Sequence, residues 1–272
     1  MTATTLTLLA SLRCTRAFAS FAAIALILSA ASIHAATAGL SGDLVWLKSK
    51  GTLLFEDSFD RDETGNGAKA IGNGWNSATA DRVPHLKQAD IDDGVLKVNS
   101  ATKEAGHAIH LHHDAGFQDG GVYLRFRLPG IVKGYRLQVG FVDREVNATV
   151  HAGHLGYAFL SQDSILLKDS KTGFHSLDVQ RRITEGKKNS GKMPEDVAAL
   201  LRNRESQVSW QADEAWHDLL LVTEGDVMRL SIDGRLVHEF ASPGFAHAMK
   251  RWVSLLSSNS FWVDDEKVWR VK

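Results

Sequence analysis

The stretch "WHDLLLVTEGDVMRLSIDGRLVHEF", residues 216–240, contains three segments in which apolar and polar side chains tend to alternate. Two short turns, "EGD" (224–226) and "DG" (233–234), separate the segments. Successive side chains of a β-strand point to opposite faces, so alternation predicts strands with one buried face. A glycine-containing turn between two such strands predicts a hairpin. This stretch therefore predicts two consecutive antiparallel hairpins.

The same alternation recurs along much of the chain. "GVYLRFRL" (121–128) is the clearest case, because every second residue is apolar. Many short strands with closely spaced turns are typical of sandwiches and jelly rolls, so we predict an all-β domain of this kind. The other predicted strands lie at 52–59, 94–100, 135–143, 148–160, 164–169, 252–258 and 261–271.

One segment departs from this pattern. Residues 181–206 are highly charged and do not alternate. Within them, Pro194 can occupy a first helical turn, and the acidic residues Glu195 and Asp196 suit a helix N-terminus. We predict a solvated insertion that carries a short helix near 194–203. It serves either as surface decoration or as a lid over a binding face.

The first 38 residues have the layout of a secretory signal peptide. They contain no acidic residue, Arg13 and Arg16 precede the apolar run 17–31, and "ATA" (36–38) provides small residues for cleavage. The apolar run is shorter than the ~20 residues that span a bilayer. We therefore expect cleavage of residues 1–38, a secreted or periplasmic location, and no stable membrane span afterwards.

The composition fits one globular domain over residues 39–272, with its core over 52–271. The 272-residue chain is 44% hydrophobic and 23% charged, and one all-β domain of about 200–250 residues is common. The only cysteine, Cys14, lies in the predicted signal peptide, which excludes an intramolecular disulfide in the mature chain. A formal net charge of −1 without a basic stripe argues against a nucleic-acid partner.

Four histidines lie within "GHAIHLHH" (106–113). On a strand, His110 and His112 share one face while Ile109 and Leu111 share the other. We predict that the two apolar residues pack into the core. The two histidines then line a polar sheet face or its rim, or contact a ligand there.

A metal site has weaker support. A zinc ion held by two histidines of one strand needs a third ligand, and the candidates His151 and His154 are spaced for opposite faces of a regular strand. The acidic turn "DRDETGNG" (60–67) offers oxygen ligands for a structural calcium, but it lacks an EF-hand pattern. We therefore predict no metal and no cofactor.

Carboxylate pairs are sparse. Retaining glycosidases use two carboxyl groups about 5–5.5 Å apart. Asp143 and Glu145, two residues apart near a strand end, are the nearest approximation and are weak catalytic candidates. Asp264 and Glu266 have the same spacing.

Three aromatic residues are candidate ligand contacts: Tyr135, Tyr157 and Trp262. Aromatic rings can support sugar rings, although tryptophan in a sandwich more often fills the core. Trp216 and Trp269 are in phase with the apolar residues of their strands, so we assign them to the core. His151 and His154 join the candidate ligand-binding set with the histidines above.

Several phrases occur in a familiar order: "LLFEDSFDR" (53–61), "DGVLKV" (93–98), "GGVYLRFRL" (120–128) and "FWVDDEKVWRV" (261–271). This order resembles the secreted concanavalin A-like lectin and glucanase sandwiches, and most closely the bacterial family labelled 3-keto-disaccharide hydrolase. The resemblance implies a jelly roll of two curved antiparallel sheets. The Glu-x-Asp-x-x-Glu signature of laminarinase-type glucanases is absent from the sequence.

The resemblance leaves three functions open. The first is a carbohydrate-directed module that binds or processes a glycan or cell-surface polysaccharide on its concave sheet. The second is a glycoside or 3-keto-disaccharide hydrolase, and the third is a structural or protein-interaction sandwich without a small ligand. Because one fold hosts many functions, the site residues must decide between them.

Overall fold

The computed structural model describes residues 42–99 and 103–272. The predicted signal peptide, residues 1–38, lies outside this range. Within the described range, no helix is long and apolar enough to cross a membrane.

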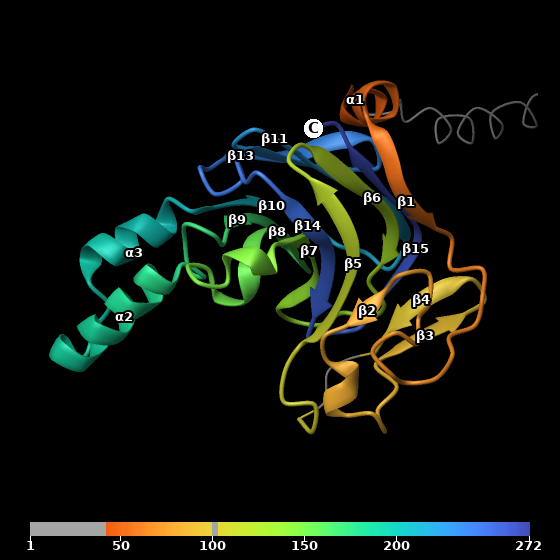
Figure 1. Ribbon diagram of the computed structural model, residues 1–272, viewed down its shortest axis with the longest axis horizontal. Coiled ribbons are helices and arrows are strands. Elements are labelled where there is room, and N and C mark those ends of the chain that lie inside the picture. The colour runs from red at the N-terminus through yellow and green to blue at the C-terminus, as the bar shows by residue number, and fades with distance from the viewer. Residues whose placement is uncertain (1–41, 100–102) are drawn as a thin grey trace, which may run out of the picture. The chain divides into compact units, whose positions relative to one another are not determined.

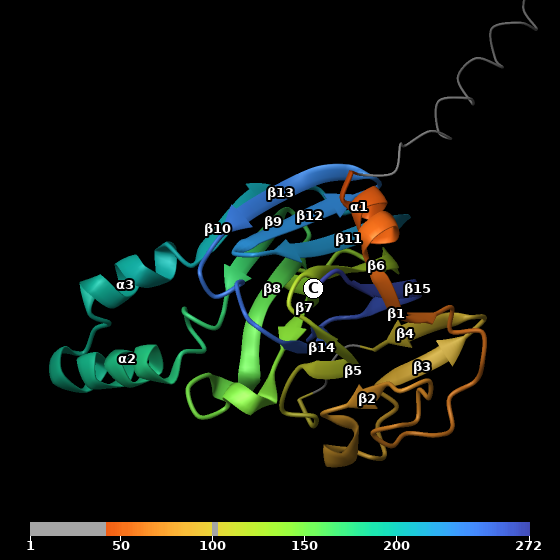
Figure 2. The same ribbon diagram turned by 45° about the horizontal axis from the view of Figure 1, so that its top comes forward.

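Two antiparallel sheets form a sandwich, which confirms the predicted fold class (Figures 1 and 2). The eight-stranded sheet contains β1 (Thr52–Asp57), β3 (Ala89–Asp92), β4 (Val95–Val98), β6 (Gly120–Arg127), β11 (Trp216–Glu224), β12 (Val227–Ile232), β13 (Arg235–Ala241) and β15 (Phe261–Arg270). Its strand order is β13-β12-β11-β6-β15-β4-β3, and β1 also pairs with β15.

The second sheet has seven strands. It contains β2 (Asn76–Ser77), β5 (Ile109–Phe117), β7 (Tyr135–Val142), β8 (His154–Ser161), β9 (Ser164–Asp169), β10 (Glu205–Ser209) and β14 (Lys250–Ser257). Its strand order is β10-β9-β8-β7-β14-β5-β2, so β5, β14, β7 and β8 are successive neighbours (Figure 1).

The core lies between the two sheets. Ile109 and Leu111 of β5, like Leu124 and Phe126 of β6, are fully buried there. Burying one such side chain contributes about 1.5–3 kcal/mol. This burial confirms the alternation of "GHAIHLHH" and leaves His110 and His112 on the opposite side of β5.

The two predicted hairpins of residues 216–240 are present as β11, β12 and β13. At the β12–β13 turn, Asp233 and Gly234 have φ values of 50° and 76°. Positive φ at both central residues is typical of the tight type I′ turn, which Asp-Gly favours.

The insertion contains two helices where we predicted one. α3 (Glu195–Arg202) agrees with the helix predicted near 194–203, but α2 (Leu177–Ser190) replaces part of the predicted loop. Ser176 caps the N-terminus of α2, and Gly191, with φ of 73°, ends the helix. The loop prediction failed because only two apolar residues of α2, Val179 and Ile183, are buried.

These two residues pack with Val197 of α3 in a small cluster of their own. Arg181 adds ion pairs to Asp178 and Glu185 on the exposed side of α2. The resulting helical hairpin projects from the sandwich beside β9 and β10 (Figures 1 and 2).

A further helix, α1 (Gly42–Lys50), precedes the first strand. Its Leu47 is fully buried against Leu220, Val222 and Trp269 on the outer surface of the eight-stranded sheet. The Asp43 carboxylate pairs with Arg229 at 2.9 Å. α1 therefore covers part of this sheet, while the outer surface of the other sheet carries the histidines.

Candidate functional site

We define the histidine face as the outer surface of the seven-stranded sheet, on which His110 and His112 lie. His112 of β5 is directly opposite Ser254 of β14, which is opposite Gly140 of β7, which is opposite Tyr157 of β8. Residues directly opposite on neighbouring strands have side chains on the same face. One row across four strands therefore brings together residues that are distant in the sequence.

Gly140 makes room for Tyr157 in this row. A Cβ atom at residue 140 would lie 2.2 Å from Cδ1 of the Tyr157 ring and 2.4 Å from the carbonyl oxygen of Gly156. The missing side chain lets Tyr157 lie over β7, where the tyrosine is only 3% exposed. A tyrosine held this closely keeps its hydroxyl group at a fixed place on the face.

Two short contacts link the imidazoles to hydroxyl groups. Nε2 of His110 lies 2.6 Å from the Ser254 hydroxyl oxygen, and Nδ1 of His154 lies 2.6 Å from that of Tyr157. The His110 and His154 rings are 6.1 Å apart between centroids. The two imidazole–hydroxyl pairs are therefore neighbours in one polar group.

A turn adds a third region to this group. The ring of His175, in the loop after β9, lies 4.5 Å from that of His154 and 6.1 Å from that of His151. His151 and His154 were expected on opposite faces of a regular strand unless a bulge intervened, and a turn separates them instead. Ala152 and Gly153 have φ values of 50° and 69°, and this tight turn brings both histidines beside His175.

We call His110, His112, His154 and His175 the histidine cluster. Burial lowers the pKa of His110 and of His175 to about 3, and that of His112 and of His154 to about 4. Repulsion from at least one neighbouring imidazolium charge adds to the lowering of the pKa for each of the four residues, and His151 has this effect on His154. The cluster is therefore neutral at pH 7, and each ring can both donate and accept a hydrogen bond.

Two nitrogen atoms of the cluster are unpartnered. Nδ1 of His112 and Nδ1 of His175 are buried and have no hydrogen-bond partner among the described residues. The His112 ring stacks on Trp252 at 4.2 Å, and the guanidinium of Arg144 lies 4.7 Å from the same indole. Buried polar atoms are usually paired, so these two unpartnered nitrogens are an unusual feature of the histidine face.

The other two histidines of "GHAIHLHH" lie elsewhere. His113 points to the core side of β5, where it stacks on Phe55 at 3.6 Å and Nε2 lies 2.8 Å from the carbonyl oxygen of Asn73. Nδ1 of His107 lies 2.8 Å from the carbonyl oxygen of Ala108. Neither residue contributes to the histidine face.

The predicted aromatic contacts divide between the two sheets. The ring centroids of Tyr135 and Phe159 are 4.8 Å apart, and Phe159 in turn lies beside Tyr157. Trp262 is on the eight-stranded sheet, between Lys97 and Arg127, and does not join the histidines.

Of the two tryptophans predicted to be in the core, Trp269 is buried. The prediction for Trp216 was wrong, because its ring lies half-buried on the outer surface 6.4 Å from that of Trp262.

The two acidic residues that were weak catalytic candidates, Asp143 and Glu145, do not form a catalytic pair. Asp143 is 3% exposed, accepts a hydrogen bond from the backbone of Glu145, and lies 2.9 Å from Nε2 of His247. Glu145 is exposed. Across β5, β14, β7 and β8 the only carboxylate is Asp114, which is exposed.

The second acidic pair is also separated. A bulge follows Asp264, and Glu266 is fully buried opposite Asp57 of β1. Burial raises the pKa of Glu266 well above its usual range, with a further contribution from the charge of Asp57.

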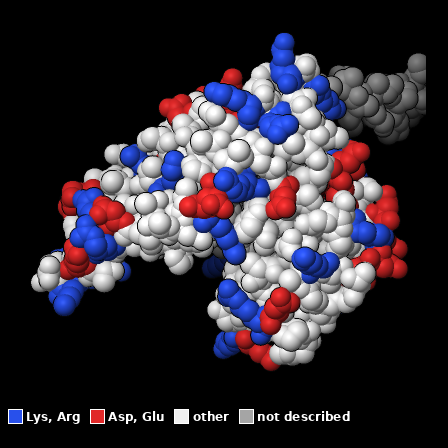
Figure 3. Space-filling model, in the orientation of Figure 1, with Lys and Arg blue, Asp and Glu red and all other residues white. Residues whose placement is uncertain are grey.

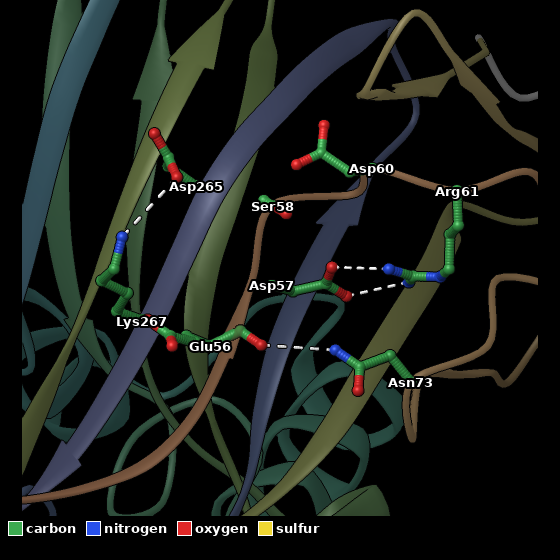
Figure 4. Close-up of a pocket in the computed structure, with 8 residues that line it drawn as sticks. All are labelled: Glu56, Asp57, Ser58, Asp60, Arg61, Asn73, Asp265 and Lys267. Carbon is green, nitrogen blue, oxygen red and sulfur yellow. Dashed lines mark hydrogen bonds and ion pairs between the residues drawn. The ribbon is translucent and has the colours of Figure 1, made fainter.

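An acidic pocket of about 380 Å³ lies beside β1 and β15 (Figure 4). Asp60 of the acidic turn 60–67 lines it, but Asp57 pairs with Arg61 at 2.6 Å and Asp265 with Lys267 at 3.6 Å. In the described part of the chain, no three or more His, Cys, Asp or Glu side chains are placed to hold a metal ion.

Comparisons with known proteins identify the fold. No protein-family model and no curated protein matches the chain. A mutant of SCLam, a non-specific endo-β-1,3(4)-glucanase of family GH16 crystallised with 1,3-β-D-cellotriosyl-glucose, has 14% identity and a TM-score of 0.52 over 82% of this chain and 95% of that one. The laminarinase from Rhodothermus marinus has 12% identity and a TM-score of 0.51 over 81% and 97%. At these identities the chain shares the jelly-roll sandwich fold of these glucanases.

Proposed function

We propose that this protein binds a glycan on the histidine face. The observation that carries the proposal is the histidine cluster itself, in which four neutral imidazoles lie together and two of them have an unpartnered nitrogen. Neutral rings that donate and accept hydrogen bonds suit sugar hydroxyl groups, and the neighbouring aromatic side chains suit the apolar faces of sugar rings. A glucanase with this fold, SCLam, was crystallised with a gluco-oligosaccharide, which supports the same class of ligand.

We further propose that the cluster cleaves glycosides that carry a ketone at C3. A mechanism with two carboxylates has few residues to use here, because Asp114 is the only acid on the four central strands. A neutral imidazole can instead act as a general base, and the negative charge that develops on the substrate beside it raises the low pKa of the imidazolium that forms. The 3-keto-disaccharide family resemblance of the sequence points to the same chemistry.

The residues can support this reaction in two steps. The ketone acidifies the hydrogen on C2, and a histidine of the cluster removes it while the Tyr157 hydroxyl donates a hydrogen bond to the developing enolate oxygen. The electron pair then forms a C1–C2 double bond as the bond from C1 to the leaving oxygen breaks, and that oxygen takes the proton from the imidazolium. Addition of water across the double bond completes a net hydrolysis.

Incubation with a β-linked gluco-disaccharide and its 3-keto derivative tests the proposal. We expect cleavage of the keto compound alone. His110→Ala and His154→Ala should abolish this cleavage. His85→Ala, which replaces an exposed side chain, is the control and should retain it. If the protein cleaves the unoxidised sugar and this cleavage depends on Glu145, the result would favour a glycoside hydrolase with carboxylate catalysis. A protein that neither binds nor cleaves either sugar would favour the structural or protein-interaction alternative.

A further inference from the structure

Arg144 places a positive charge beside the histidine cluster. It begins the short 3₁₀ helix η2 (Arg144–Val146) after β7, and its guanidinium lies 4.7 Å from the ring centroid of Trp252. The ring of His112 stacks on the same indole at 4.2 Å. Trp252 is two residues from Ser254 on β14, so its side chain is on the histidine face. One aromatic side chain therefore contacts both a cation and a neutral imidazole of this face.

Arg144 has no ion pair among the described residues, and its side chain is exposed. The carboxylate next to it in the sequence, that of Asp143, is engaged elsewhere. It lies 2.9 Å from Nε2 of His247 and 3.6 Å from Nε of Arg251. The guanidinium of Arg144 can therefore meet a ligand without first breaking a contact with a carboxylate of the protein.

A second unpaired cation acts on the cluster. Arg82, in the 3₁₀ helix η1 (Ala80–Arg82), is exposed and likewise has no ion pair in the described part of the chain. Burial is the main cause of the low pKa of His110, and the charges of Arg144 and Arg82 lower it further. Asp114 of β5, which is exposed, has the opposite effect on His112. Two unpaired positive charges and one negative charge leave an excess of one positive charge.

Acidic and basic side chains are mixed over the surface that Figure 3 shows, and no broad area of one sign dominates this view. The formal net charge of the chain, −1, is also small. Attraction of an anionic ligand therefore depends on individual side chains such as Arg144, and not on a long-range field of the whole molecule.

A carboxylate is the anion that this arrangement fits best. A guanidinium presents parallel N–H donors that match both oxygens of a carboxylate, and such charge-assisted hydrogen bonds are about twice as strong as neutral ones. One carboxylate also supplies the single negative charge that balances the excess. A phosphate monoester carries up to about two negative charges near pH 7, which is more than the site balances. Nδ1 of His112, which is buried and unpartnered, offers a further polar contact beside the same indole.

We propose that the glycan bound on the histidine face carries a carboxylate, as a uronic acid unit does, and that Arg144 binds this group beside Trp252. This inference rests on the proposed glycan-binding function and adds the charge and the functional group of the ligand. It makes Arg144 a specificity-determining residue, in addition to the four histidines that contact the sugar hydroxyl groups.

Calorimetric titration with three disaccharides of one backbone tests the inference. The probes are cellobiose, cellobiouronic acid, which has a carboxylate in place of the C6 hydroxymethyl group of its non-reducing unit, and the methyl ester of that acid. We expect the wild type to bind the acid at least about tenfold more tightly than the ester or cellobiose, because hydrogen bonds between charged groups are the stronger ones. Added salt should reduce this preference, because Arg144 is exposed to solvent.

Four variants locate the source of the preference. Arg144→Gln should abolish it, whereas Arg144→Lys should retain part of it, because the charge remains but the two parallel donors are lost. Asp114→Asn should strengthen binding of the acid, because it removes a neighbouring negative charge. Arg235→Gln is the matched control and should keep the wild-type preference, since Arg235 is an exposed arginine on the eight-stranded sheet.

The outcomes separate the two proposals. Equal affinities for the acid and its ester, or a preference for the acid that survives in Arg144→Gln, overturn the inference and leave the proposed function in place. Tighter binding of cellobiose sulfated at the same C6 position than of the acid would overturn the carboxylate as the recognised group. A wild type that binds none of these probes contradicts the inference, and turnover of the 3-keto disaccharide then decides separately whether the proposed function stands.

Discussion

Nε2 of His110 on β5 and the hydroxyl oxygen of Ser254 on β14 lie 2.6 Å apart, although the residues are separated by 144 positions in the sequence. Ser254 is fully buried, so it fixes the imidazole from below. Nδ1 of His154 has a similar contact with Tyr157. Hydroxyl groups beneath the imidazoles therefore orient two members of the histidine cluster.

Ser254→Ala should destabilise the protein by about 1 kcal/mol, because it removes a buried hydrogen bond and leaves a nitrogen of His110 unpaired. It should also weaken glycan binding, because the ring can then rotate. Thr223→Val is the matched control, since its buried hydroxyl has no hydrogen-bond partner in the described part of the chain. Chemical denaturation of the two variants compares the losses, and equal losses would show that the His110–Ser254 contact contributes nothing.

The free energy of unfolding should fall as the pH drops from 6.5 towards 4. The folded protein keeps His112 and His154 neutral down to a pKa of about 4, whereas histidines of the unfolded chain take up protons near pH 6.5. Below pH 6.5 the unfolded state binds more protons, so acid favours unfolding, with a slope of up to about 1.4 kcal/mol per pH unit for each histidine.

His112→Gln should flatten this slope, because glutamine does not titrate. His85→Gln, at an exposed position, provides the control. Urea titrations at a series of pH values measure the slopes. If His112→Gln leaves the pH dependence of the free energy of unfolding as steep as in the wild type, His112 is not a buried neutral histidine.

Gly140→Ala should destabilise the protein by about 1–3 kcal/mol, because its Cβ atom would overlap Tyr157 and the Gly156 carbonyl. Displacement of Tyr157 should also reduce glycan binding. Gly67→Ala serves as the control, since a Cβ atom there meets nothing within 4 Å. Thermal unfolding and binding are the two measurements, and a Gly140→Ala protein with unchanged stability would mean that Tyr157 does not occupy this position.

Asp143→Asn should lower stability by about 1–3 kcal/mol, because a buried carboxylate would lose its charge-assisted contact with His247. Glu145→Gln should change neither stability nor turnover of a 3-keto disaccharide. Denaturation curves and activity assays distinguish these effects. Full stability with lost activity in either variant would restore the pair as catalytic candidates.

Local patterns in the sequence were sufficient to predict the strands, the turn at Asp233-Gly234 and the shared face of His110 and His112, because they depend on alternation and turn chemistry. The contacts of these histidines were not predictable. Ser254 reaches His110 only through the β5–β14 register, and no local pattern specifies which strands become neighbours.

His175 was missed for a related reason. It lies in an irregular loop without periodicity, and its place beside His154 depends on backbone hydrogen bonds to Leu155. α2 was missed because only a narrow stripe of it is buried, so its polar surface resembles a loop in sequence. Acidic residues can be located directly in a sequence, but whether they are buried cannot. Asp143 and Glu266 are examples, because both are buried in the structure.

The central claim is that a glycan binds on the histidine face, and the imidazole resonances in two-dimensional NMR test it most directly. On titration with a β-linked gluco-oligosaccharide, the account predicts that the signals of His110, His112, His154 and His175 shift with one common binding isotherm. The signals of His85, which is exposed, and of His217, which lies on the eight-stranded sheet, should stay in place. Saturable binding that shifts His217 or His85 while the histidine cluster remains unchanged would contradict the account.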